Sequence, residues 1–502
     1  MRARVLAAAA TIAALTACTA GQPDEGASPP APATSPAANP STTPPGATAS
    51  PSPTATNPTT TNPTTSDPTA QPVTQPLVLA VHATRTVADV PTKAARTLAD
   101  RATRDKRLTI RWAELKQPGG GRAEVRLATT KTAARALLKD VHADDDLLAL
   151  VPAEAVDERV RVLTVGGRHP LRDPARYPLR TSAAEAQPEV TTVTIVGDVM
   201  LGRRVARASG NDPSRPLRPT AKRLASAEIT VGNLESTLSD DGSPTQGGDS
   251  FHADPAIIKG LELAGFDAVV LANNHLGDYG QRALRQTLAT LRAADLPYVG
   301  AGRNLTEARR PVIISRDGVR VGFIATESIG ETPAATADRG GTNRLNMPPR
   351  TGPLNEKQLD RISGDIEKLA DRVDVVIVIP HWGTQYTHVP EASQRRAARA
   401  FVTAGADLVI GGHPHWVQGW ERMSGSLVVH SLGNFVFDMD FQTKTMEGIF
   451  VEIVLWDDEV KAVEPVPYRL DSRFVPRVVK GRQAERILGD VWSTSRGAFA
   501  RP

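Results

Sequence analysis

The stretch from residue 405 to residue 415 constrains the fold more than any other part of the chain. Residues 408–410 are Leu-Val-Ile, an apolar run that predicts a buried strand of an α/β sheet. His413 and His415 follow, two residues apart. In an extended backbone such residues point to the same side, and open α/β sheets bind ligands beyond the carboxyl ends of their strands. We therefore expect both imidazoles to face one site, although this stretch alone fits a pair of surface histidines equally well.

The residues between the strand and the histidines suit a close approach to a ligand. Gly411 and Gly412 carry no Cβ, so the main chain can turn sharply and come near a bound group. Pro414 restricts the backbone between the two imidazoles and lowers the entropy cost of holding them in place.

Other apolar runs in the second half of the chain also end in polar side chains. These residues are Asp198, Glu235, Asn274 with His275, and His381. Together they offer oxygen and imidazole donors without thiolate, which suits Mn, Fe or Zn in a reactive site better than a structural zinc site. Packing alone does not account for five polar strand ends in one domain, so the pattern predicts a metal site.

Helix-like and strand-like runs alternate from residue 191 onward. Helices are expected at 281–294, 356–372 and 391–404, between strand-like runs, which indicates an α/β core. Residues 448–455 and 460–465 then follow each other as strands, so the domain is mixed rather than doubly wound. We assign residues 190–475 to this domain and expect a C-terminal tail over 476–502.

The first 17 residues are typical of a bacterial export signal. A positively charged start precedes a short apolar segment that ends in Leu-Thr-Ala-Cys, which resembles a lipobox. Cys18 is the only cysteine in the chain, so an intramolecular disulfide is excluded. We expect Cys18 to be lipidated and to hold the protein in the membrane, on the extracytoplasmic face. An ordinary secretory signal with an incidental cysteine is the alternative.

Two further segments precede the large domain. Residues 18–76 are rich in Pro, Thr, Ser and Ala with few large apolar side chains, which predicts a disordered tether. Residues 77–183 predict a small α/β domain of unknown role, with strands at 77–81 and 147–151. The net charge of +4 is small for 502 residues, and no basic run carries interleaved aromatic residues. Nucleic acid is therefore not expected as a partner.

Six short blocks of the large domain occur in a recognisable order. They read GDVMLGR at 197–203, GNLE at 232–235, LANNHLGD at 271–278, PHWG at 380–383, GHPH at 412–415 and SLGNF at 431–435. This series resembles the calcineurin-like metallophosphoesterases, and among them most closely the CapA branch, named for poly-γ-glutamate capsule biosynthesis. The resemblance implies an αββα sandwich with its site at one edge of the β-layers.

The resemblance also implies a role for each donor. It places two divalent cations in the site, with Glu235 bridging them. The first cation would be bound by Asp198 and His415, and the second by Asn274, His381 and His413. His275 would be the acid that protonates the leaving group.

The substrate side of the site is less defined by sequence. Asp278 lies three residues after His275 and can hold its ring by a hydrogen bond. Arg203 follows the first strand and can bind an anionic group. His252 and Asn434 are further candidates for substrate contact, with loop stabilisation as the alternative role of each.

Two positions depart from the superfamily pattern. Met200 stands where histidine is usual, and Glu235 stands where aspartate is usual. A thioether is a weak ligand for a hard or borderline cation, so the first metal would lose one donor. Both changes look usual for the CapA branch.

Two functions are compatible with these residues. The first is a membrane-tethered, metal-dependent hydrolase that faces the cell envelope and acts on a phosphate ester or an anionic polymer. The second is a non-catalytic accessory lipoprotein in the synthesis and export of poly-γ-glutamate or a similar capsule polymer, acting within a capsule-synthesis complex.

Overall fold

The computed structural model describes residues 73–184, 188–210, 212–239 and 241–502. The export signal, Cys18 and the tether up to residue 72 lie outside the described residues, so these assignments stay predictions. The tether was expected to continue to residue 76, but the first strand already begins at Thr74.

The first part of the described chain forms a sheet of its own. Its strand order is β2-β3-β4-β1-β5, and β6 also pairs with β1. The strands are β1 (Thr74–His82), β2 (Leu108–Arg111), β3 (Arg122–Leu127), β4 (Leu147–Pro152), β5 (Val160–Val162) and β6 (Arg180–Ser182). Helices α1 (Thr92–Arg104) and α2 (Lys131–Val141) pack against this sheet.

Two larger sheets form the centre of the domain that follows. The first has the order β12-β11-β8-β7-β22-β23-β24, and β21 also pairs with β7. Its strands are β7 (Val190–Val199), β8 (Ile229–Leu234), β11 (Ala268–Val270), β12 (Tyr298–Val299), β21 (Asn434–Val436), β22 (Glu447–Trp456), β23 (Glu459–Leu470) and β24 (Pro476–Val478). Parallel pairing of β7, β8 and β11 brings their carboxyl ends to one edge of this sheet.

The second large sheet has the order β14-β15-β17-β18-β20-β19. Its strands are β14 (Val312–Arg316), β15 (Val319–Glu327), β17 (Val375–His381), β18 (Leu408–Ile410), β19 (Trp420–Met423) and β20 (Ser426–Val429). Two short pairs lie outside the large sheets: β9 (Thr237–Leu238) with β10 (His252–Ala253), and β13 (Ala301–Gly302) with β16 (Gly341–Thr342).

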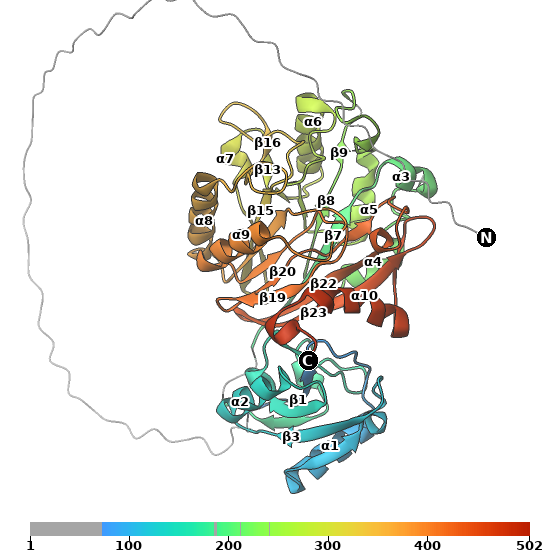
Figure 1. The fold of residues 1–502 in the computed structure, drawn as a ribbon, viewed down its shortest axis with the longest axis vertical. Helices are drawn as coiled ribbons and strands as arrows, with labels where there is room; N and C mark the ends of the chain where they lie inside the picture. Colours follow the sequence, from blue (N-terminus) through green and yellow to red (C-terminus); the bar gives the residue numbers. More distant parts are fainter. Residues whose placement is uncertain (1–72, 185–187, 211, 240) are drawn as a thin grey trace, which may run out of the picture. The chain divides into compact units, whose positions relative to one another are not determined.

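The two large sheets pack face to face and helices cover their outer sides. Ile195 and Val231 of the first sheet share one buried core with Phe323 and Ile377 of the second. The helices are α3 (Arg203–Ser209), α4 (Arg218–Leu224), α5 (Ile258–Leu263), α6 (Gly280–Ala293), α7 (Leu305–Ala308), α8 (Glu356–Ala370) and α9 (Ala392–Thr403). Helices α4, α5 and α6 cover the first sheet, whereas α8 and α9 cover the second (Figure 1). The predicted αββα sandwich is confirmed.

The C-terminal residues differ from the tail expected over 476–502. They form β24 and the helix α10 (Gly481–Thr494), and α10 buries Ile487, Val491 and Trp492 in the core between the sheets. The ring of Trp492 meets that of Trp420 edge-on, with centroids 5.3 Å apart. Apolar residues at helical spacing were the sequence signal for this amphipathic helix.

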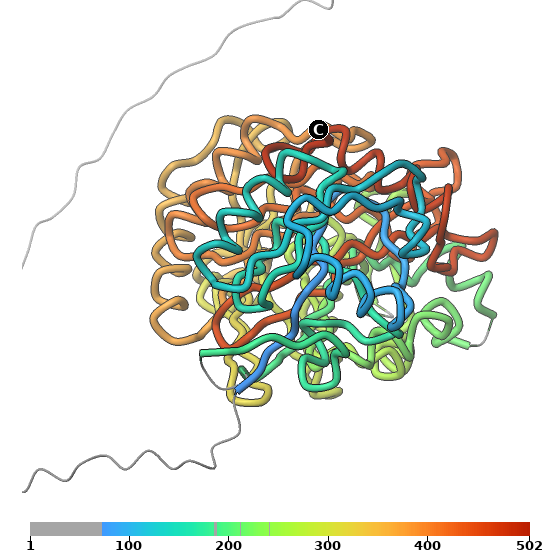
Figure 2. The backbone as a smooth tube through the Cα atoms, turned by 90° about the horizontal axis from the view of Figure 1, so that it is seen from below, coloured from blue at the N-terminus to red at the C-terminus, as the bar shows by residue number. Residues whose placement is uncertain are grey.

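The small sheet and the large domain share a core. Ala80 and Leu171 belong to the same buried cluster as Val454 and Trp456 of the β22–β23 hairpin. The indole N–H of Trp456 donates to the Leu171 carbonyl at 2.8 Å. Residues 74–182 therefore adjoin the C-terminal strands, as the blue-to-teal and red segments do in both views (Figures 1 and 2).

Within the described ranges, no helix combines the length and apolar character needed to cross a membrane.

Candidate metal centre

Strand ends from both large sheets converge on one buried cluster. Asp198 in β7, Glu235 just after β8 and His381 at the end of β17 each offer a ligand atom, and these atoms lie within 4.8 Å of one another. All three side chains are buried. The β7 and β8 ends come from one sheet and the β17 end from the other, so the cluster forms only when the two sheets pack.

The remaining predicted ligands lie in the same cluster. His413 Nδ1 is 3.2 Å from His381 Nε2. His415 Nδ1 is 3.7 Å from Asp198 Oδ2. Asn274 Oδ1 is 2.9 Å from His381 Nε2. The six side chains expected to bind metal are therefore brought together by the fold.

The two histidines of the GHPH block do converge, but their backbone conformation differs from the one that the sequence predicted. An extended chain was expected, but His413 has a φ of +91° and His415 a φ of +57°. Both values lie in the left-handed region, which costs a non-glycine residue on the order of 1–3 kcal/mol. A tight turn, rather than strand alternation, brings the two ring centroids to 5.6 Å. Such local strain is typical of functional sites.

Two asparagines that the sequence analysis did not single out organise the carboxylates. Asn233 Nδ2 donates to Asp198 at 2.8 Å and to Glu235 at 3.2 Å. Asn273 in turn donates to Asn233 Oδ1 at 3.0 Å, which fixes the orientation of that amide. Both asparagines lie inside blocks that were already quoted, next to the residues chosen as ligands.

His275 is held rigidly beside the cluster. Its Nδ1 is 2.7 Å from Asp278 Oδ2, which is the pairing expected from their spacing. Phe251 stacks on the imidazole with centroids 3.6 Å apart and an interplanar angle of 18°. The other ring nitrogen, Nε2, lies 3.8 Å from Glu235 Oε1 and so faces the donors.

The three residues considered for substrate contact have different surroundings. Asn434 is fully buried, and its Oδ1 lies 2.8 Å from His415 Nδ1, so it orients that imidazole from behind. Arg203 is paired with Asp438 through Nε at 3.2 Å and lies over the Phe251 ring. His252, in β10, is half-buried.

Met200 does not replace the usual imidazole. Its sulphur accepts the N–H of Gly202 at 3.2 Å, and its side chain belongs to the apolar core on the helix-covered side of the first sheet. The cluster therefore has no donor from this position.

Burial dominates the electrostatics of the cluster. It raises the pKa of Asp198 to about 6 and that of Glu235 well above its usual value. It lowers the pKa of His381 and His413 well below the usual value and that of His415 to about 4. Neutral imidazoles are the form that binds metal, and a cation among them would favour ionised carboxylates.

Three buried atoms of the cluster have no hydrogen-bond partner among the described residues. They are Glu235 Oε1, His413 Nε2 and His415 Nε2. Leaving such an atom unpaired costs about 1–3 kcal/mol, so three in one place need a common explanation. Carboxylate oxygen and imidazole nitrogen are ligands of Mn, Fe and Zn, and the donor set therefore fits a divalent cation.

Comparison with known proteins gives one matching family model and several curated relatives. Residues 192–439 match the family model described as bacterial capsule synthesis protein PGA_cap. A capsule biosynthesis protein CapA of Bacillus anthracis is 32% identical over 320 residues, which cover 62% of this chain and 75% of that protein. The PGA biosynthesis protein CapA of Bacillus subtilis is 28% identical over 322 residues, covering 62% and 81%.

Two further matches extend the comparison. A probable polyglutamine synthesis accessory protein of Mycobacterium tuberculosis is 28% identical over 295 residues, covering 50% of this chain and 76% of that protein. A solved hypothetical protein from Thermus thermophilus has a TM-score of 0.35 at 16% identity, covering 56% of this chain and 99% of that chain. The extent of the Bacillus anthracis match and the family model together place this chain in the CapA family of bacterial capsule synthesis proteins.

Proposed function

We propose that this protein is a metal-dependent hydrolase of the cell envelope that acts on a phosphate ester or on an anionic capsule polymer. The observation that carries the proposal is His275, an imidazole clamped by Asp278 and Phe251 with its free nitrogen toward the donor cluster. A purely cation-binding site has no need of a positioned acid beside its ligands. The capsule-related names of the relatives support a polymer as the wider context.

The donor cluster would hold two divalent cations. The residues that would bind them are Asp198, Glu235, Asn274, His381, His413 and His415. Bound cations supply Lewis acidity, which polarises a phosphoryl group and lowers the pKa of water.

The chain's own residues supply positioning and proton transfer. Asp278 accepts the Nδ1–H of His275 and holds the ring so that Nε2 faces the donors, from where a proton on Nε2 would pass to the leaving-group oxygen. Asn434 fixes the ring of His415, and Asn233 fixes the two carboxylates. The substrate therefore meets a rigid set of groups.

Replacement of His275 tests this role. His275→Ala in protein loaded with Mn²⁺ should lower the hydrolysis of bis-p-nitrophenyl phosphate by roughly 100-fold or more, while metal content measured by elemental analysis stays the same. Full activity of the variant, beside a clearly active wild type, would contradict the assigned role.

The location of the protein is part of the proposal. Residues 1–17 and Cys18 lie outside the described residues, and the proposed lipid anchor rests on the sequence pattern. Cys18→Ala should move the protein from the membrane fraction to the soluble fraction. Mass spectrometry of the mature N-terminus should find a lipid on Cys18 in the wild type.

An accessory, non-catalytic role in a capsule-synthesis complex is the second candidate. The position of Met200 favours it, because the first cation lacks an imidazole that the superfamily usually provides. Metal stoichiometry separates the two functions. About two equivalents per chain after aerobic loading support the hydrolase, and none supports the accessory role.

A further inference from the structure

Tyr386 lies in the loop between β17 and α9, directly beside the donor cluster. Its backbone N–H donates to the Pro414 carbonyl at 2.9 Å, inside the turn that carries His413 and His415. Its φ is +60°, a left-handed value that is unfavourable for a residue with a Cβ. The loop is thus tied to the turn that presents two of the donors, at a conformational cost that typical loop residues avoid.

The ring of Tyr386 is held between two aromatic neighbours. One is His415, whose ring is nearly parallel at 28° with centroids 6.0 Å apart. The other is Phe441, which meets the phenol ring edge-on at 89° and 5.5 Å. Phe441 is 59% exposed, so an apolar side chain stays in solvent and packs on the tyrosine. These contacts hold the phenol ring beside the imidazole of His415.

No described residue forms a hydrogen bond with the hydroxyl, and because the side chain is only half-buried the hydroxyl is open to solvent. The surrounding rings connect it to a cation. Phe437 packs edge-on against both His415 and Phe251, and the Arg203 guanidinium lies over Phe251. The phenol is therefore a neutral donor beside His415, on the side of the cluster that carries Arg203.

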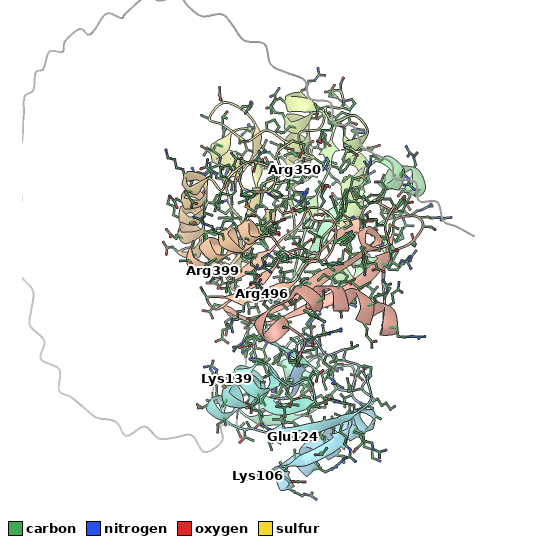
Figure 3. The ribbon with its side chains drawn as sticks, viewed as in Figure 1. Lys106, Glu124, Lys139, Arg350, Arg399 and Arg496 are labelled. Carbon is green, nitrogen blue, oxygen red and sulfur yellow. The ribbon has the colours of Figure 1, made fainter. Side chains whose placement is uncertain are left out.

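Arg203 is a rigid neighbour rather than a flexible surface side chain. Asp438 pairs with it through Nε at 3.2 Å, and its guanidinium carbon lies 4.2 Å from the centroid of Phe251, the ring that also stacks on His275. A further cation, Arg350, lies in the loop between β16 and α8 and pairs with Glu331 (Figure 3). The surroundings of the cluster thus combine the positive charge of Arg203 with the hydroxyl of Tyr386.

We propose that Tyr386 is a substrate-binding residue whose hydroxyl donates a hydrogen bond to a phosphoryl oxygen of the substrate, beside the Arg203 guanidinium. This inference rests on the proposed function, because it takes the ligand of the donor cluster to be a phosphate ester. A phenol hydroxyl can turn its proton toward a phosphoryl oxygen, which complements the guanidinium donors that lie in one fixed plane.

Binding of inorganic phosphate to the Mn²⁺-loaded full-length protein tests the proposal. Isothermal titration calorimetry should give a Kd for Tyr386→Phe that is about tenfold weaker than for the wild type, as expected for one lost hydrogen bond to a charged group. The manganese content per chain should not change. Tyr298→Phe is the matched control. The hydroxyl of Tyr298 donates to Glu307, which does not belong to the donor cluster. This variant should therefore bind phosphate as the wild type does.

Each result separates this proposal from the proposed function. If the wild type binds phosphate and Tyr386→Phe binds it equally well, the role of Tyr386 is wrong and the hydrolase stands. If the variant loses manganese, Tyr386 is a structural support of the donor turn and the proposal is overturned. If the loaded wild type does not bind phosphate, the role of Tyr386 falls, and the hydrolase is then judged by the His275→Ala assay alone.

Discussion

The α-carbon of Gly412 lies so close to the Asp198 carboxylate that any side chain at position 412 would displace one of the two. A Cβ built on Gly412 would lie 2.8 Å from Asp198 Oδ1 and 3.6 Å from His381 Nδ1. Gly412, the glycine of the GHPH block, therefore makes room for a carboxylate that belongs to the other sheet. This contact is the point at which the two halves of the sandwich meet in the metal site.

Gly412→Ala should weaken metal binding. The new methyl group must displace the Asp198 carboxylate or the turn itself, and we expect Mn²⁺ affinity to fall by roughly 10–100-fold, the range for changes that disturb ligand orientation. Competition with a fluorescent chelator measures this directly. Gly364→Ala is the control, because a Cβ at Gly364 in α8 meets nothing within 4 Å; equal loss in both variants would refute a specific effect at Asp198.

Asn233→Ala should loosen the two carboxylates. The variant removes the amide that donates to both Asp198 and Glu235, so the free protein holds two buried acidic groups less firmly. We expect a fall in Mn²⁺ affinity of about tenfold or more with the fold intact by circular dichroism. Asn304→Ala, which removes the N-cap of α7, is a control that should leave metal affinity unchanged.

Glu421→Gln should destabilise the protein in a pH-dependent way. Burial alone would raise the pKa of Glu421, but His430 and Arg395 overcome it and hold the pKa at about 2, against an ordinary value of 4.5. A depressed pKa adds stability that is present above 4.5 and is lost as the pH falls toward 2. Urea unfolding of metal-free protein at pH 7 should show a loss of about 1–3 kcal/mol in the free energy of unfolding.

The same comparison at lower pH checks the sign. The difference between wild type and Glu421→Gln should shrink as the pH falls below 4.5, because the carboxylate of the unfolded wild type then gains a proton, whereas that of the folded protein gains one only near pH 2. A difference that stays constant down to the lowest pH at which both proteins fold would show that packing, not charge, carries the effect.

Trp492→Ala should reveal the importance of the C-terminal helix. The indole is 3% exposed and packs against Trp420 in the core between the sheets. Loss of a buried tryptophan costs about 3–5 kcal/mol, which should lower the melting temperature measured by calorimetry. Arg482→Ala, an exposed change in the same helix, should have little effect. If the wild type and Trp492→Ala have the same melting temperature, residues 481–494 do not contribute to the stability of the core.

The site could be assembled from sequence only to a certain depth. Asp198, Glu235, His381, His413 and His415 were each recognisable because a polar residue ended an apolar run. The asparagines that orient these ligands were not recognisable from the sequence. Asn233 and Asn273 act through contacts with side chains from other strands, and neither contact leaves a trace in the local pattern.

Tyr386 shows the same limit. In the sequence it is one aromatic residue in a polar loop, and its place beside His415 depends on how that loop folds onto the turn after β18. The same holds for the GHPH turn. The alternation of side chains along an extended strand predicted that the two imidazole rings converge, but the backbone conformation that it assumed was wrong.

By itself, the sequence determined the strand and helix order of the large domain, the donor residues and their family, because short-range periodicity and motif spacing are local properties. Only the tertiary structure decided which face Met200 takes, how α10 completes the core and which amides orient the carboxylates. These features depend on contacts between residues far apart in the chain, and such contacts exist only once the two sheets have packed against each other.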